Sequence, residues 1–245
     1  MACNMNPSTP PIFPKLTAKT PTILFSSPAI KSKLKLQTIR ATSSTYTQEQ
    51  PQLTQSQPPK TSFYNVKFKT LGDCKLGISW YPDFVYDAQG GLGTGTGTKP
   101  ENDSEILVSF DVKTLYIPPL NSSTTRFLGL PLPSILKIDI VPEVFRGIID
   151  EDSGKVNLEF KAKFWFSIGT IYKAPPLVVE TILTSEESVG SRRRGRGENL
   201  DKEGKCKLVG VATVYPIDDF FLNTFLLLPN ECLAELNATI NLSAS

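Results

Sequence analysis

The sequence predicts an all-β fold, an antiparallel β-sandwich or β-barrel of about nine strands with at most one or two short helices. Apolar and polar residues alternate with a period of two along most of the chain from Phe63 onward. Such alternation is typical of strands that have one buried face and one face in water. Only one segment, residues 216–228, has the composition of a helix.

The first half of this region contains five expected strands. In the third of them, Ile106 and Val108 alternate with Glu105 and Ser109, and the strands at 64–68, 74–80 and 136–140 show the same pattern. Burial of one face of each strand against the others supplies the hydrophobic core. The five expected strands are residues 64–68, 74–80, 105–113, 136–140 and 144–149.

Residues 156–168 give the clearest strand signal, because seven apolar residues from Val156 to Ile168 occupy every second position. The preceding segment Asp150-Glu151-Asp152-Ser153-Gly154 has the residue types of a hairpin turn. The strand at 156–168 is therefore expected to pair with 144–149.

Three further strands are expected at 177–184, 206–215 and 232–242, and a short helix precedes the last of them. Asp218 or Asp219 would cap that helix, and Pro229 would end it. Helix capping also explains the adjacent pair of aspartates without a catalytic role.

The composition divides the chain into three parts. Residues 1–41 are expected to be a plastid transit peptide, 42–62 a disordered linker, and 63–245 a single antiparallel β domain. Two segments rich in Gly and Thr or in charge, 88–104 and 185–205, are expected to be flexible loops.

The plastid assignment rests on the absence of acidic residues before Glu49, together with many Ser, Thr and Pro residues. Repeated prolines and a single Arg disfavour the amphipathic helix of a mitochondrial presequence, which remains an alternative together with a plain disordered tail. The expected location is the chloroplast, in the stroma or on the stromal face of the thylakoid. Residues 1–48 hold six of the 26 basic and none of the 24 acidic residues, so their removal leaves 20 basic against 24 acidic residues.

The available chemistry is restricted by the absence of histidine from the chain. This excludes Ser-His-Asp and Cys-His catalysis and histidine-ligated metals. Cys74, Cys206 and Cys232 are too far apart for a metal site and are expected to be buried, with a redox pair of Cys74 and Cys206 as the alternative. We expect no catalytic residues, no metal and no cofactor.

Two motifs suggest phosphate or nucleic-acid binding and fail in detail. The glycine-rich run from Gly90 to Lys99 lacks the Gly-Lys-Ser/Thr of a phosphate-binding loop. The arginines at 192–194 and 196 are flanked by acidic residues without interleaved aromatic residues, which favours a solvated hairpin over contact with RNA or anionic lipid headgroups. We expect no nucleic-acid partner.

Two clusters of phenylalanines are the candidate ligand-binding residues. One lies on the apolar face of the strand at 156–168 and the other in the apolar run at 220–228, which could pack as core or cover a cavity. Apolar segments punctuated by proline, 117–120 and 127–133, are expected at a cavity mouth or partner contact. The candidates are Phe160, Phe164, Phe166, Phe220, Phe221 and Phe225.

The sequence is compatible with three functions. The first is a non-catalytic plastid protein that binds an apolar ligand of the lipid, pigment or quinone class, which is broadly similar to plastid all-β proteins that hold apolar molecules. The second is an assembly or scaffold factor that contacts a protein partner or a membrane surface through its apolar loops. The third is an enzyme that uses carboxylate or lysine chemistry.

Overall fold

The computed structural model describes residues 61–101 and 103–245, and these form an all-β fold, as predicted. The expected transit peptide and nearly all of the expected linker lie outside the described residues. The principal strands are β1 (Thr61–Thr70), β2 (Cys74–Ile78), β3 (Phe84–Tyr86), β4 (Leu92–Pro100), β5 (Glu105–Phe110), β6 (Thr125–Phe127), β7 (Leu130–Pro131), β8 (Leu136–Asp150), β9 (Val156–Ile168), β11 (Leu177–Thr184), β14 (Lys205–Val214) and β15 (Asn230–Ala244). The smaller elements are β10 (Tyr172–Lys173), β12 (Glu187–Val189), β13 (Arg194–Arg196) and the helix α1 (Phe220–Leu226).

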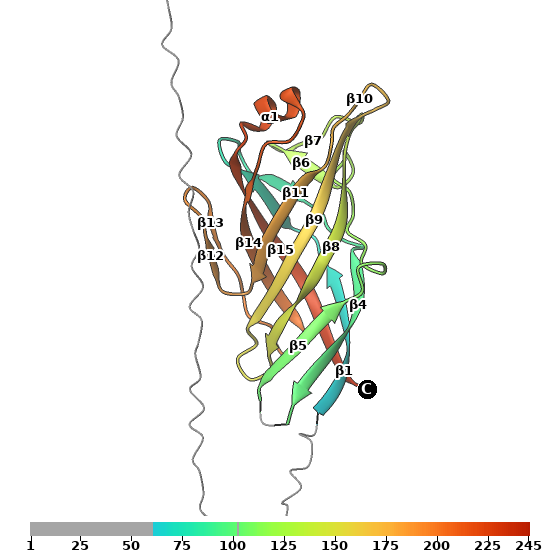
Figure 1. The fold of residues 1–245 in the computed structure, drawn as a ribbon, viewed down its shortest axis with the longest axis vertical. Helices are drawn as coiled ribbons and strands as arrows, with labels where there is room; N and C mark the ends of the chain where they lie inside the picture. Colours follow the sequence, from blue (N-terminus) through green and yellow to red (C-terminus); the bar gives the residue numbers. More distant parts are fainter. Residues whose placement is uncertain (1–60, 102) are drawn as a thin grey trace, which may run out of the picture. The chain divides into compact units, whose positions relative to one another are not determined.

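Eight of these strands close into an antiparallel barrel in the order β1-β4-β5-β8-β9-β11-β14-β15. The ring closes because β15 also pairs with β1, in a register that runs from Tyr64 opposite Ala244 to Thr70 opposite Ala238. Figure 1 shows the tilted strands of this barrel. We call the end that carries α1 and the β6–β7 hairpin the upper end, and the end at which β1 begins the lower end.

The upper end has an additional wall because β15 changes partner along its length. Its lower part pairs with β1, whereas Cys232–Glu235 pair with β2, which continues through β3 and β6 to β7. A bridge between Leu120 and Ile138 of β8 joins this wall to the far side of the barrel. The upper end is therefore built from more segments than the lower end.

The lower half of the barrel is filled with packed aromatic rings. Phe145 stacks on Phe110 at 4.6 Å between ring centroids and meets Phe68 edge-on at 5.0 Å and Phe160 edge-on at 6.0 Å. Such offset and edge-on contacts add to the free energy that burial of the rings contributes. These rings form a solid floor beneath the upper half of the interior.

The expectation of a flexible loop at 88–104 is wrong, because this segment contains β4 between β1 and β5. Its glycines alternate with threonines, and the glycines face the interior, where Gly93 and Gly97 are buried. A Cβ atom added at Gly95 would lie 2.4 Å from the carbonyl oxygen of Ser109. Glycine is therefore required by a close approach of two strands, and it is not a sign of a loop here.

Other predicted elements agree with the structure in position and differ in extent. The expected strands at 136–140 and 144–149 form one strand, β8, with an irregularity between Pro142 and Val144. The expected hairpin places Ile149 opposite Val156.

The segment 185–205, expected to be a flexible loop, contains the β12–β13 hairpin, which packs against β14 and β15. The helix α1 begins after Asp219, one of the two predicted caps.

The outer face of the barrel carries exposed ion pairs, such as Arg146 with Glu159 at 2.8 Å and Lys161 with Glu180 at 3.2 Å. Exposed pairs of this kind contribute little to the free energy of unfolding because water and salt screen them. None of the helices in the described part of the chain is sufficiently long and apolar to cross a membrane.

Candidate functional site

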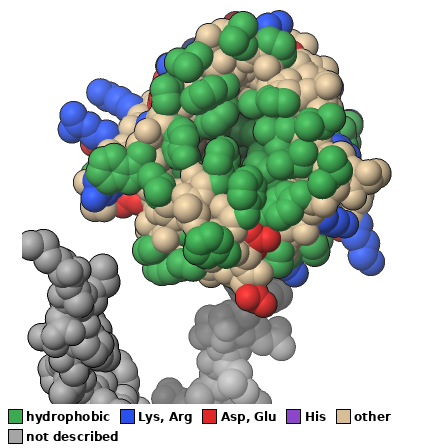
Figure 2. Space-filling view, turned by 90° about the horizontal axis from the view of Figure 1, so that it is seen from above, with side chains coloured by type: hydrophobic (Ala, Val, Ile, Leu, Met, Phe, Trp, Pro, Cys, Tyr) green, Lys and Arg blue, Asp and Glu red, His purple; other side chains and the backbone are tan. Residues whose placement is uncertain are grey.

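The upper half of the barrel encloses an apolar cavity of about 450 Å³. Its walls come from β2, β8, β9, β11, β14 and β15, and α1 contributes Phe225 and Leu226 at the upper end. No charged side chain lines this cavity. Seen from above, apolar side chains surround a central hollow (Figure 2).

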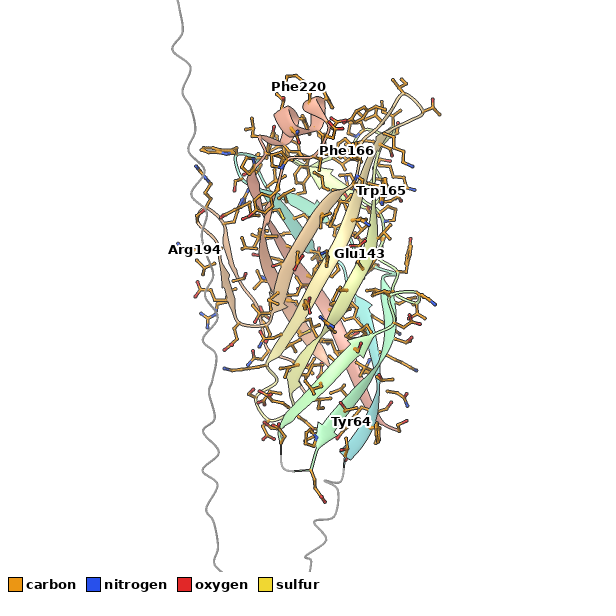
Figure 3. All side chains as sticks on the ribbon, in the orientation of Figure 1. Tyr64, Glu143, Trp165, Phe166, Arg194 and Phe220 are labelled. Atoms are coloured by element: carbon orange, nitrogen blue, oxygen red, sulfur yellow. The ribbon has the colours of Figure 1, made fainter. Side chains whose placement is uncertain are left out.

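The alternation of the strands places apolar side chains on the cavity wall. On β9, Phe160, Phe164 and Phe166 face inward, and on the paired strand β11 the lining runs from Leu177 to Leu183. Trp165 does not line this cavity and lies in a groove on the outside of the barrel (Figure 3). This is expected because Trp165 lies between Phe164 and Phe166, and successive side chains of a strand point to opposite faces of the sheet.

Small inward-facing residues leave the space that the cavity occupies. Gly210 and Ala212 on β14 and Ala234 on β15 line it, at positions where other strands carry leucine or phenylalanine. The sequence analysis did not identify these residues as part of a site. The small residues at inward positions of two adjacent strands are the feature of the sequence that indicates free space there.

The structure brings together four of the six predicted ligand-binding residues. Phe160, Phe164, Phe166 and Phe225 line the cavity, whereas Phe220 points away from it at the upper end and is 87% exposed (Figure 3). The remaining one, Phe221, stacks against Phe225 with 6.0 Å between centroids and meets Tyr172 edge-on at 5.3 Å. Phe221 therefore supports the ring of Phe225 without lining the cavity.

The proline-punctuated segments also take part in the cavity. Leu120, Phe127, Leu132 and Pro133 line it, so that 117–120 and 127–133 close the upper end between β3 and β8. Neither segment was placed in a strand by the sequence, although 125–127 and 130–131 form a small hairpin.

The helix α1 covers part of the opening and is held at both ends. The Asp219 carboxylate accepts a hydrogen bond from the Leu222 amide at 2.7 Å, and the Asn230 side-chain amide donates to the Leu226 carbonyl oxygen at 2.8 Å. The Tyr81 hydroxyl donates to the Phe225 carbonyl oxygen and links the helix to the β2–β3 turn. Leu222 is fully buried beneath the helix.

Three lining residues carry a polar side-chain atom, and the two hydroxyl groups among them already donate to backbone carbonyl oxygens. The hydroxyl groups of Tyr81 and Thr181 donate to the carbonyl oxygens of Phe225 and Val211. Burial raises the pKa of the Cys232 thiol to about 11, so that it stays protonated at physiological pH. The wall of the cavity is therefore almost entirely apolar.

The rim of the opening is apolar and exposed. Ile171 at the β9–β10 turn is 90% exposed, and Leu128 and Leu130 of the β6–β7 hairpin and Leu227 after α1 are also exposed. Together with Phe220, these side chains come from three separate segments of the chain at the upper end. Exposed apolar clusters of this kind mark contact surfaces in proteins.

Two of the clustered arginines contact other residues of the fold, and Cys74 and Cys206 are buried. Arg193 pairs with Asp83 at 2.6 Å, and the Arg192 guanidinium lies 4.3 Å from the centre of the Trp80 ring. Cys74 and Cys206 are free thiols in separate core clusters. Within 61–101 and 103–245, no group of three His, Cys, Asp or Glu side chains is arranged to hold a metal ion.

No protein-family model matches the sequence, and no curated protein or solved structure is significantly similar to the chain. The case for a function therefore rests on the cavity and its rim.

Proposed function

We propose that this protein is a non-catalytic binding protein for an apolar ligand, which it holds in the upper half of the barrel. The observation that carries the proposal is the cavity of about 450 Å³ lined without any charged side chain. Ligand pockets of proteins span roughly 300–1,000 Å³ and are lined mainly by apolar side chains. A chloroplast location, in the stroma or on the thylakoid surface, is part of this proposal and is supported by the acid-free segment at 1–48.

Apolar burial supplies the driving force for such binding. Each Å² of apolar ligand surface that leaves water contributes about 25 cal/mol. The wall is held by the strand ladders of the barrel, so little ordering is needed on binding. A third function, enzymatic chemistry by carboxylate or lysine groups, gains no support from a cavity without such groups.

A dye titration tests the proposal. Nile red added to the purified protein is expected to bind saturably, and substitution Ala212→Phe is expected to weaken binding strongly, because the added ring occupies the cavity above Ala234, nearer its opening. The matched control is Thr213→Phe, since Thr213 is the exposed neighbour on the same strand. Saturable binding that is equal in both variants would contradict the proposal.

Native mass spectrometry of protein purified from a plastid-containing host supplies the second test. We expect a bound apolar species that organic extraction releases and that Ala212→Phe protein does not carry. A clean apo mass together with no dye binding would overturn the proposal.

A second candidate function is association with a lipid bilayer through the apolar rim, and the exposed side chains of Ile171, Leu128 and Phe220 favour it. Large apolar side chains at loop tips insert into the interfacial region of a bilayer, where their burial is favourable. Phe220→Asp is expected to reduce co-sedimentation with vesicles of chloroplast galactolipids. The control is Phe63→Asp, an exposed phenylalanine at the beginning of β1 on the lower end. An equal effect of both substitutions would count against a contact through the rim.

A further inference from the structure

We infer that the cavity takes a hydrocarbon chain, inserted end first, with the polar end of the ligand at the upper opening. This inference rests on the proposed function and narrows its ligand class. It distinguishes a molecule with a long apolar chain from a compact ring with polar substituents.

The length of the cavity is the first argument. Its lining follows β9 from Phe160 to Phe166 and β11 from Leu177 to Leu183, a rise of six residue steps along each strand. At about 3.3 Å per residue and a strand tilt of roughly 40°, the lined depth is about 15–20 Å. The cavity is therefore deep compared with its volume.

The volume is sufficient for a chain of that length. A cavity of about 450 Å³ that extends over this depth is wide enough for an extended polymethylene chain, whose carbon atoms need about 3.5–4.0 Å to the atoms of the wall. Since an alkyl chain advances roughly 1.3 Å per bond, about 12–16 carbon atoms fill the depth.

The polarity of the wall is the second argument. The hydroxyl groups of Tyr81 and Thr181 already donate to backbone carbonyl oxygens, and Cys232 offers only a weak thiol donor. A ligand carbonyl, hydroxyl or carboxylate deep in the cavity would lose its hydrogen bonds to water without replacement. The inserted part of the ligand is therefore hydrocarbon.

The closed lower end fixes the orientation. Beneath the cavity the rings of Phe68, Phe110 and Phe145 pack against one another and against Phe160, which forms the deepest part of the wall on β9. The hollow opens at the upper end (Figure 2), where Phe225 is only half-buried. A chain with one polar end can satisfy that end in water only if the chain itself points downward.

A chain-length series of fatty acids, measured by displacement of Nile red, tests the inference. Affinity is expected to rise about fourfold for each added methylene group. The rise is expected to level off at about 12–16 carbon atoms, where the depth is filled. An affinity independent of chain length would overturn the inference.

The second arm compares ligands of equal length. A saturated dicarboxylic acid with the chain length of the best fatty acid is expected to bind at least about 100-fold more weakly, because insertion would desolvate one carboxylate. Equal binding of both acids would contradict insertion end first. Tetramethylbenzoquinone, a compact ring with two carbonyl groups, is expected to bind more weakly than the best fatty acid.

The third arm changes the depth of the cavity. Ala234→Phe narrows the cavity opposite Gly210, below Ala212, and is expected to shorten the preferred chain without loss of Nile red binding. Thermal unfolding in the absence of ligand shows whether this variant is folded. If the dye and the quinone bind well and fatty acids do not, the proposed function stands and the inference fails. If no apolar molecule binds, the proposed function itself fails.

Discussion

At the scale of single residues, the Glu231 carboxylate accepts four hydrogen bonds from the turn between β12 and β13. The Ser191 hydroxyl and amide donate to one of its oxygens at 2.6 and 2.7 Å, and the amides of Arg192 and Arg193 donate to the other at 2.7 and 3.0 Å. These donors lower the pKa of Glu231 to about 2. One side chain of β15 thus holds the turn between β12 and β13.

The first prediction concerns the pH dependence of this contact. Because the pKa of Glu231 is lower in the folded state than its ordinary value of 4.5, its contribution to the free energy of unfolding is fully present above that value. It is lost as the pH falls from 4.5 towards 2. Glu231→Gln is therefore expected to lower Tm at pH 7 and to have progressively less effect below pH 4.5. A constant difference in Tm across this range would contradict the assignment.

At the scale of elements, β4 shows how close approach of two backbones constrains a strand. Its inward positions carry glycine because the neighbouring strand β5 leaves no room for a side chain at Gly95. The threonines between the glycines face outward and supply the β propensity that the glycines lack. The strand is therefore specified by its neighbours as much as by its own sequence.

The second prediction is that Gly95→Ala destabilises the barrel by about 2–3 kcal/mol, because the added Cβ atom forces β4 away from β5. Thr96→Ala, on the outer face of the same strand, is expected to cost less than about 1 kcal/mol. Urea unfolding of both variants measures the difference. Equal destabilisation would show that the strands separate more easily than the structure implies.

The helix α1 is the second element whose role can be tested. The third prediction is that Tyr81→Phe, which removes the hydroxyl donor to the Phe225 carbonyl oxygen, loosens α1 over the opening. A neutral hydrogen bond contributes about 1 kcal/mol, so release of bound Nile red is expected to accelerate about fivefold. Stopped-flow dilution measures this rate, and Tyr215→Phe serves as an exposed control. An unchanged release rate would mean that α1 does not limit exchange.

At the scale of the whole molecule, the barrel combines a packed half and a hollow half in one sheet. Leu158 and Leu208 are completely buried in the lower cluster, whereas Leu236 and Val179 line the cavity. The same strands β9, β14 and β15 run through both halves. Stability and ligand binding are therefore separated along the barrel axis.

The fourth prediction follows from this separation. Leu158→Ala is expected to cost about 2–5 kcal/mol in the free energy of unfolding, since the close-packed lower half cannot collapse around the lost methyl groups. Val179→Ala in the cavity wall is expected to cost less than about 1.5 kcal/mol and to leave the fold intact. Chemical denaturation measures both values. A larger cost for the Val179 variant would contradict the division into two halves.

Several features were determined by the sequence alone. The period-two alternation at 156–168 and 232–242 gave both the strands and their inward faces, and Asp219 and Pro229 gave the limits of the only helix described. The alternation also identified Phe160, Phe164 and Phe166 as neighbours on one face, because side chains of a strand point alternately to its two sides. These are local properties, which a few adjacent residues fix.

Only the tertiary structure decided which half of the interior is hollow. Filled and hollow barrels have the same alternation, since the free space depends on the summed volumes of side chains from strands far apart in the chain. Phe145 fills the lower half because it meets Phe68 and Phe110, whereas Phe164 lines the same cavity as the small residues of β14 and β15. The sequence did not predict strand β4 for a similar reason. Its glycines are required by a close contact with β5, which no local sequence pattern within β4 itself reveals.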